Sequence, residues 1–300
     1  MKQKIKILIP LFLVIVLTIL SSIGAFADTI YTHDGYRYTI INNFSVSICG
    51  CDNNITDLLI PGEINQRAVV DIGNRAFMNN TAITSVDFSN ANNLARIGSF
   101  AFRGCSGLSE ELVLPASIQT LGTAAFEDCN SITAVTVAGE VTEIPAQCFN
   151  RCVALENVTL TDSISSIGNY AFADCESLTY LELSHKVTNI ASSAFNGDNN
   201  LTLGVWYGTA GYDYAIAQNI SYTLLDGVKL GDVSGDGSVN INDVTTVQRY
   251  LAELETLEGI YLHAADANQD GTVDIADATV IQMYLAEYEM EYPIGEVMTQ

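Results

Sequence analysis

Apolar residues form three aligned columns through the middle of the chain, with repeats of 23 to 25 residues. An aliphatic residue stands five positions before each phenylalanine of the central column, and another stands six positions after it. The central column consists of Phe77, Phe102, Phe126, Phe149, Phe172 and Phe195. One such unit cannot bury its apolar face alone, whereas stacked copies join the columns into one core. The pattern therefore predicts a solenoid of six repeats.

Each repeat divides into two patterned segments. Alternating apolar and polar residues, as in Leu155–Leu160, predict a short half-buried strand. The block I-G-x-x-A-F-x-x-C, as in Ile167–Cys175, predicts a turn followed by a short helical turn. A further alternating stretch before the repeats, Gly35–Ile48, suggests a hairpin.

The first residues have the three parts of a secretory signal peptide. Three lysines precede the apolar run Ile7–Leu20, and Ala25-Phe26-Ala27 forms a cleavage site. This run is shorter than the roughly 20 residues that a spanning helix needs, and Pro10 interrupts it. We expect cleavage after Ala27 and a soluble, secreted, extracellular protein with no membrane span.

The chain is strongly acidic, with 12 Lys+Arg against 35 Asp+Glu and a net charge of −23. Nucleic acids and anionic membranes would repel it, so neither is an expected partner. Removing the three signal-peptide lysines leaves 9 − 35 = −26. Residues 228–300 hold 14 acidic and 2 basic residues, a net charge of −12, which makes this end a candidate for cation binding.

Two twelve-residue loops near this end, 34 residues apart, have the spacing of EF-hand calcium loops. Side-chain oxygens stand at positions 1, 3, 5, 9 and 12, glycine stands at position 6, and position 7 offers its backbone carbonyl. The expected ligands of two Ca²⁺ ions are Asp232, Ser234, Asp236, Ser238, Asn240 and Asp243 in the first loop, and Asp266, Asn268, Asp270, Thr272, Asp274 and Asp277 in the second.

The segments after the loops have the apolar spacing of amphipathic helices. The apolar positions are Val244, Val247, Leu251 and Leu254 in the first copy, and Ala278, Ile281, Leu285 and Tyr288 in the second. We expect Val244 and Leu251 to pack in a core. Both loops end in Asp where a standard EF-hand has Glu, and Leu230 and Gly231 leave no room for a helix before the first loop.

Two family resemblances rest on these motifs. The repeat block resembles the BspA-like leucine-rich repeats of bacterial surface proteins. The duplicated loop–helix units, with Asp at the last position and Tyr-Leu-Ala-Glu at the end, resemble a type I dockerin. The resemblances imply an α+β leucine-rich-repeat solenoid followed by a small all-α dockerin with two calcium loop–helix motifs. The expected segments are signal peptide 1–27, β-rich cap 28–57, repeats 58–205, closing cap 206–226, dockerin 230–290 and tail 291–300.

The dockerin resemblance also implies a partner, because dockerins bind cohesin modules of scaffoldins in cellulosome-type assemblies that degrade polysaccharides. Family recognition positions fall on Ile241, Asn242, Gln248 and Arg249 in the first copy, and on Ile275, Ala276, Gln282 and Met283 in the second. Many clostridial dockerins carry Ser-Thr at the first two of these positions. This chain does not, which favours another specificity group. The two copies match only in part, so binding through both faces is only partly supported.

Seven cysteines in an exported chain raise the question of disulfides. Cys105, Cys129, Cys152 and Cys175 share one repeat column, which favours a ladder of buried thiols. Cys148 also occupies a core position. Cys49 and Cys51, two apart in an expected strand, point to opposite faces and are poorly placed to bond to each other.

No catalytic motif accompanies these features, and caps and repeats use nearly all of residues 28–226. We therefore expect a non-catalytic binding or adhesion protein whose repeats recognise a protein or carbohydrate ligand. The alternative is an accessory subunit or an unrecognised hydrolase acting on plant polysaccharide. The outward strand positions form a polar surface that includes one aromatic residue, Tyr180.

Overall fold

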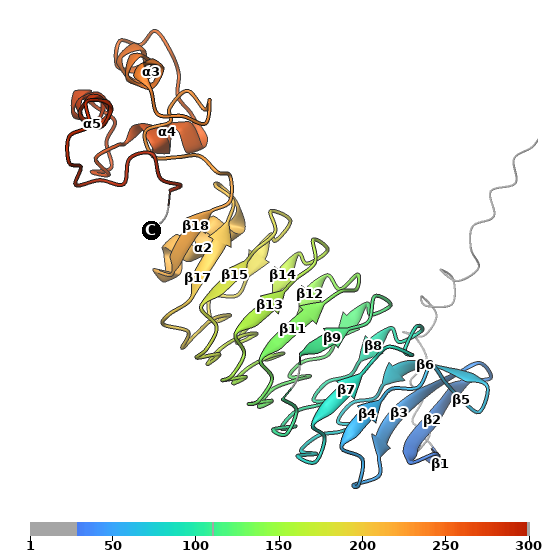
Figure 1. The fold of residues 1–300 in the computed structure, drawn as a ribbon. Coiled ribbons are helices and arrows are strands. Elements are labelled where there is room, and N and C mark those ends of the chain that lie inside the picture. Colours follow the sequence, from blue (N-terminus) through green and yellow to red (C-terminus); the bar gives the residue numbers. More distant parts are fainter. Residues whose placement is uncertain (1–28, 110, 299–300) are drawn as a thin grey trace, which may run out of the picture.

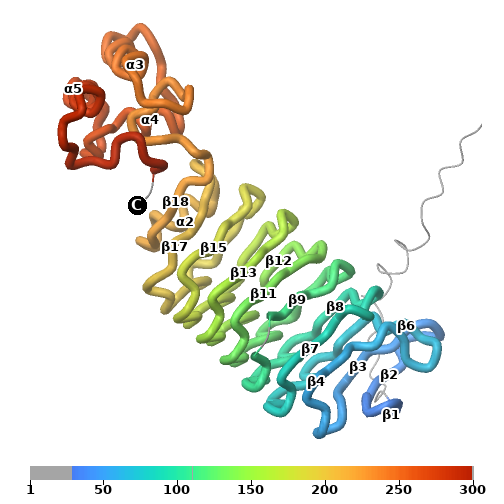
Figure 2. The backbone as a smooth tube through the Cα atoms, viewed as in Figure 1, coloured from blue at the N-terminus to red at the C-terminus, as the bar shows by residue number. Residues whose placement is uncertain are grey.

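The computed structural model describes residues 29–109 and 111–298, so the expected signal peptide lies outside the described residues. The chain forms an elongated solenoid of about eight turns, with a helical module at its C-terminal end (Figure 1). The tube view shows successive coils stacked side by side along one axis (Figure 2). The predicted fold, a repeat solenoid followed by a small helical module, is confirmed.

The solenoid begins with an antiparallel meander of β1 (Tyr31–His33), β2 (Tyr36–Asn42) and β3 (Ser45–Cys51). The β2–β3 pair is the hairpin that the sequence suggested. Strand β3 then pairs in parallel with β6 (Arg67–Ile72), which also takes β5 (Glu63–Ile64) as an antiparallel neighbour. This meander gives the first coil of the stack a strand to pair with.

Two rows of short strands run along the coils, and each row is divided into sheets of two or more strands that pair in parallel. The first row continues from β6 through two-residue strands: β8 (Arg96–Ile97), β10 (Thr120–Leu121), β12 (Glu143–Ile144), β14 (Ser166–Ile167) and β16 (Asn189–Ile190). The second row consists of β4 (Asp57–Leu59), β7 (Ser85–Asp87), β9 (Leu112–Leu114), β11 (Ala134–Val137), β13 (Asn157–Thr159), β15 (Tyr180–Glu182), β17 (Thr202–Val205) and β18 (Ser221–Leu224). The expected half-buried strands are therefore present.

The phenylalanine column forms the centre of the core. Consecutive rings from Phe77 to Phe195 stack with centroid distances of 5.0 to 5.5 Å. The four inner rings are completely buried. Aromatic pairs at this separation add to the stabilisation from burial, so each coil is held to the next through its ring.

The block around each phenylalanine is not the helical turn that the sequence predicted. It is a run of β-turns in which alternate N–H groups bond to the neighbouring coil. Phe100 donates to the Thr123 carbonyl at 3.0 Å, and Phe102 donates to Ala125 at 2.8 Å. Phe100 adopts a left-handed φ of 60° to aim its N–H outward. Because these N–H groups donate to carbonyl groups of the next coil, they are not available for hydrogen bonds within a helix.

The cysteine column is a ladder of free, buried thiols, as predicted. Each Sγ donates to a phenylalanine carbonyl of the preceding coil, at 3.1 to 3.3 Å. Burial raises the pKa of Cys105 to about 12, which keeps this thiol protonated. Cys49 and Cys51 are also unbonded.

A short helix closes the solenoid, and three more form the C-terminal module. Helix α2 (Ala210–Gln218) lies between β17 and β18. The module contains α3 (Ile241–Leu251), α4 (Gly259–Ala265) and α5 (Ile275–Leu285), with α3 packed against α5. Among the described residues, no helix is long and apolar enough to cross a membrane.

The C-terminal segment, residues 294–298, returns to the point where the chain enters this module. Leu230 donates to the Glu296 carbonyl at 3.0 Å and accepts from Gly295 at 2.9 Å. The Leu224 N–H of β18 donates to the Met298 carbonyl at 3.1 Å. The segment therefore links the module to the last strand of the solenoid.

Only the first half of each predicted apolar helix stripe is buried. Val244, Val247, Ala278 and Ile281 are buried. The expected core position of Leu251 is wrong, because this side chain is 37% exposed. Helix α3 ends at Leu251, so this side chain lies in the last turn of the helix.

Candidate functional site

Two carboxylates organise the first predicted calcium loop. The buried Asp232 accepts hydrogen bonds from the backbone N–H groups of Asp236 and Gly237, at 3.1 and 2.9 Å. Asp243 is fully buried and accepts from Ser234 at 2.8 Å and from Asn240 at 2.7 Å. The last of these bonds belongs to the capping box that starts α3. The first and last loop positions are thereby drawn to the same side of the turn.

The second loop repeats this geometry. Asp266 accepts from Asp270 and Gly271 at 3.1 and 2.9 Å. Asp277 is fully buried and accepts from Asn268 at 3.1 Å and from Asp274 at 2.8 Å. Gly271 has a φ of 89°, which glycine adopts without strain. Two independent loops with the same bond pattern identify a duplicated structural unit.

The loop carboxylates lack cationic partners within the described residues. Burial raises the pKa of Asp232, and the neighbouring carboxylates of Asp243 and Asp236 raise it further. Burial likewise raises the pKa of Asp277. Lys229 lies nearby, but its Nζ donates to the Gly237 carbonyl at 2.9 Å. Buried carboxylates without a counter-ion are costly, so this donor set fits a bound cation.

The ligands do not converge fully in this structure. No group of three Asp, Glu, His or Cys side chains in residues 29–109 and 111–298 forms a ready metal cage. The Asn240 amide instead donates to Asp236 at 3.0 Å and to the Ser238 carbonyl at 3.1 Å. The Asp236 carboxylate and the Ser238 carbonyl, which are both expected ligands, therefore already face one partially positive group, the Asn240 amide.

All eight positions expected to contact cohesin are exposed. Ile241 and Ile275 are each 62% exposed in the first turns of α3 and α5. Gln248 and Gln282 stand seven residues further along each helix, on the same face. Exposed isoleucines at equivalent positions of two packed helices are candidates for partner contact.

Comparison with protein families assigns both parts of the chain. The model for the BspA type leucine rich repeat region matches residues 70–202 in six copies, and that for the dockerin type I domain matches residues 230–286. The chain carries a BspA-type leucine-rich repeat region and a C-terminal type I dockerin domain. The dockerin implies cohesin binding, and type I dockerins bind calcium. Both families are typically non-catalytic, and both are typical of extracellular or cell-surface proteins.

Solved structures that match this chain include leucine-rich repeat proteins. A leucine rich cell surface protein from Faecalibacterium prausnitzii is 25% identical with a TM-score of 0.45, and the match covers 60% of this chain and 55% of that one. The T. pallidum leucine rich repeat protein is 20% identical with a TM-score of 0.40, over 59% and 72% of the two chains. The chain thus spans about half the length of the first relative. No curated protein matches the sequence.

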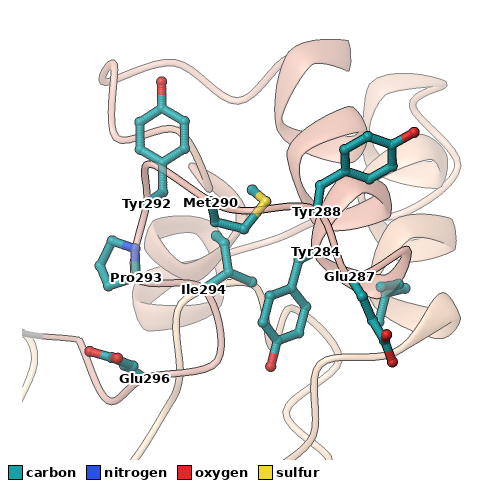
Figure 3. A pocket seen from close by; sticks show the side chains of 9 residues that line it. Tyr284, Glu287, Tyr288, Met290, Tyr292, Pro293, Ile294 and Glu296 are labelled. Atoms are coloured by element: carbon teal, nitrogen blue, oxygen red, sulfur yellow. The ribbon is translucent and has the colours of Figure 1, made fainter.

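A shallow hollow of about 500 Å³ lies where the dockerin meets its C-terminal segment. Figure 3 shows that the hydroxyl groups of Tyr284, Tyr288 and Tyr292 point in different directions. Glu287 and Glu296 lie on separate sides of the hollow.

The structure adds residues that the outward strand pattern did not select. Tyr180 is exposed as expected, and its ring extends over Gly204 of the neighbouring strand. Trp206 is half-buried two residues beyond Gly204. The only available signal in the sequence was that Trp206 is the single tryptophan of the chain.

Proposed function

We propose that the protein is an exported, non-catalytic binding protein whose dockerin anchors it to the cohesin of a scaffoldin in a cellulosome-type assembly. Its solenoid would hold a protein or carbohydrate ligand. The observation that carries the proposal is the duplicated unit in which a loop with buried carboxylates leads into a helix with an exposed isoleucine. This unit couples cation binding to the presentation of a partner surface.

Each loop would hold one Ca²⁺ through the six positions expected from the sequence. The ion would neutralise carboxylates that otherwise repel one another. Asp243 and Asp277 have a second task, because each also completes the capping box of its helix. Calcium binding would therefore stabilise the first turns of α3 and α5, where Ile241 and Ile275 lie. Ligands that bind only the folded state stabilise it by mass action.

Chelation tests the calcium requirement. We expect EDTA to remove the helical circular dichroism of the dockerin in the mature chain, while the β-rich signal of the solenoid remains. Asp232→Ala and Asp266→Ala should each weaken calcium binding in calorimetry, and Asp162→Asn, an exposed acid in the repeats, serves as control. An unchanged helical signal in EDTA would overturn the calcium proposal.

Calorimetry against cohesins of the same organism tests the partner. Ile241→Asp and Ile275→Asp place a charge in the proposed contact, and each should lower the affinity at least tenfold if its helix carries binding. Leu254→Asp is the matched control, because Leu254 is 70% exposed but lies beyond the end of α3. Loss only in the double variant would indicate that either helix can bind. Full affinity in the double variant would contradict the proposed surface.

A hydrolase remains the second candidate from the sequence. Incubation of the purified chain with plant polysaccharides, followed by a reducing-sugar assay, separates the two functions. We expect no sugar release above a heat-treated control. Release that follows the chain through purification would replace the binding function with a catalytic one.

A further inference from the structure

The last strands of the solenoid carry an aromatic side chain laid along the sheet surface. Tyr180 of β15 pairs with Thr202 of β17 and reaches diagonally across to Gly204. A Cβ at position 204 would lie 2.5 Å from the tyrosine hydroxyl oxygen and 3.1 Å from Cζ. Only glycine leaves this space open. The hydroxyl also donates to Glu182 at 3.1 Å, which fixes the ring across the two strands.

A second aromatic group continues this surface. Gly204 and Trp206 stand two residues apart, and the intervening Val205 is fully buried, so the tryptophan side chain leaves on the outward side. In extended chain, two residues span about 7 Å, which is the expected separation between the backbone at Gly204 and at Trp206. The ring of His185, from the turn after β15, lies nearly perpendicular to the indole ring, at a centroid distance of 6.1 Å. Tyr180, Trp206 and His185 together form what we call the aromatic strip.

Hydroxyl and amide groups occupy most of the other outward positions on the strands that carry the aromatic strip and on their neighbours. The remaining outward positions of β13, β15, β17 and β18 are Asn157, Thr159, Glu182, Thr202, Ser221 and Thr223. Glu182 is the only charged group among them. Residues 152–228 contain one lysine and no arginine against eight acidic residues. An anionic polymer would be repelled here, whereas a neutral chain rich in hydroxyl groups would find many partners.

We infer that the aromatic strip binds a neutral oligosaccharide, whose pyranose rings stack on Tyr180 and Trp206 and whose hydroxyl groups bond to Glu182 and the neighbouring threonines. This inference rests on the proposed function, because it specifies the ligand of the solenoid. The C–H face of a pyranose is weakly positive and complements the negative face of an aromatic ring. Sugar hydroxyls donate strongly to a carboxylate.

The composition of the strip favours a sugar over a protein partner. The centres of protein interfaces are desolvated and apolar around their aromatic residues. Here the other outward positions of the neighbouring strands are threonine, serine, asparagine and Glu182, which remain partly or fully exposed. The tyrosine hydroxyl is already bonded to Glu182, so Tyr180 offers mainly its ring surface.

Fluorescence of the single tryptophan gives a direct test. The mature chain in Ca²⁺ would be titrated with cello-, xylo- and manno-oligosaccharides, and with polygalacturonate as the anionic arm. We expect a neutral oligosaccharide to change the Trp206 emission in a saturable, salt-insensitive manner. Calorimetry with the same sugar should show about a tenfold loss of affinity in Tyr180→Ala and in Trp206→Ala.

Two further variants separate recognition from folding. Gly204→Ala keeps both aromatic residues but displaces the Tyr180 ring from the sheet surface, so it should also weaken binding. Tyr170→Ala removes a tyrosine that is 45% exposed in a turn outside β15, and it should bind like the wild type. Circular dichroism checks that each variant is folded.

The inference is overturned if no neutral oligosaccharide binds at millimolar concentration. It is also overturned if polygalacturonate binds equally well, or if the strip variants keep full affinity. Capture of a protein partner that Tyr180→Ala abolishes, without any sugar binding, would assign the strip to protein recognition. None of these outcomes bears on cohesin binding, which is measured separately on the dockerin.

Discussion

Asp198 occupies the last position of the cysteine column, and its ionisation should make the stability of the solenoid depend on pH. Its carboxyl group is 7% exposed, accepts a hydrogen bond from the Cys175 N–H at 2.7 Å, and has no bond to its second oxygen. Burial raises the pKa of Asp198 to about 7, and the negative charge of Asp174 adds to the effect. The neutral form is therefore favoured in the folded chain.

The folded pKa of about 7 lies above the ordinary value of 3.8, so the folded state retains a proton that the unfolded chain loses. The contribution of Asp198 to stability is then fully present below about pH 4 and is lost as the pH rises toward 7. The difference between the two pKa values corresponds to at most about 4 kcal/mol. Relaxation around the ionised group reduces this, and we expect a loss of about 2 kcal/mol.

Asp198→Asn removes the ionisation and keeps an oxygen for the Cys175 bond. Asparagine already stands at the first position of the same column, as Asn80. We expect the variant to match the wild type near pH 4 and to exceed its free energy of unfolding by about 2 kcal/mol at pH 8. Urea titrations followed by Trp206 fluorescence measure this difference, and Asp162→Asn is the control. A difference that does not change with pH, or a variant less stable at pH 8, would refute the reasoning.

Three other substitutions or truncations test the packing. Phe149→Ala removes a fully buried ring between two stacked neighbours. It should lower the free energy of unfolding in urea titrations by about 3–5 kcal/mol. A loss below about 1 kcal/mol would count against the phenylalanine column as the centre of the core. Arg103→Met breaks the 2.8 Å ion pair with the buried Glu127. It should lower the free energy of unfolding by about 3 kcal/mol in the same assay, and adding Glu127→Met should recover part of this loss. If the double variant recovers no stability, the loss does not come from the unpaired carboxylate. Deleting residues 293–300 removes the partners of Leu230 and should lower the calcium-loaded melting temperature of the dockerin by several degrees in calorimetry. The solenoid loses the bond from Leu224 to Met298, so its own transition should shift by a smaller amount.

The parts of the fold that the sequence predicted are those with periodic burial. Phe126 and its equivalents recur every 23 to 25 residues, and this is enough to indicate stacked coils. The helical turn after Ile167 was a wrong prediction, because local sequence does not show that alternate N–H groups bond to the next coil. Leu251 was misplaced for a related reason. Its spacing fits a buried stripe, but its burial depends on which elements pack against α3, and the spacing along one helix does not show this.

The candidate sites divide in the same way. Loop positions such as Asp232 and Asp277 follow from a spacing that is local in the chain. The aromatic strip does not, because it requires Tyr180 to cross a strand boundary and occupy the space above Gly204. No local pattern links residues that are 24 positions apart through one ring. Such a feature becomes visible only when the register of β15 and β17 is known.

The return of residues 294–298 to the entry point of the dockerin affects how a force would pass through the protein. A single connecting chain would act as a free pivot, and the solenoid could swing about its anchor. Here Leu230 and Leu224 are each tied to the returning segment, so two backbone segments run through the joint and resist bending. An anchored dockerin would then fix the direction in which the solenoid projects. The solenoid would act as a stiff lever, with its sheet faces held at a set angle to the assembly that carries it.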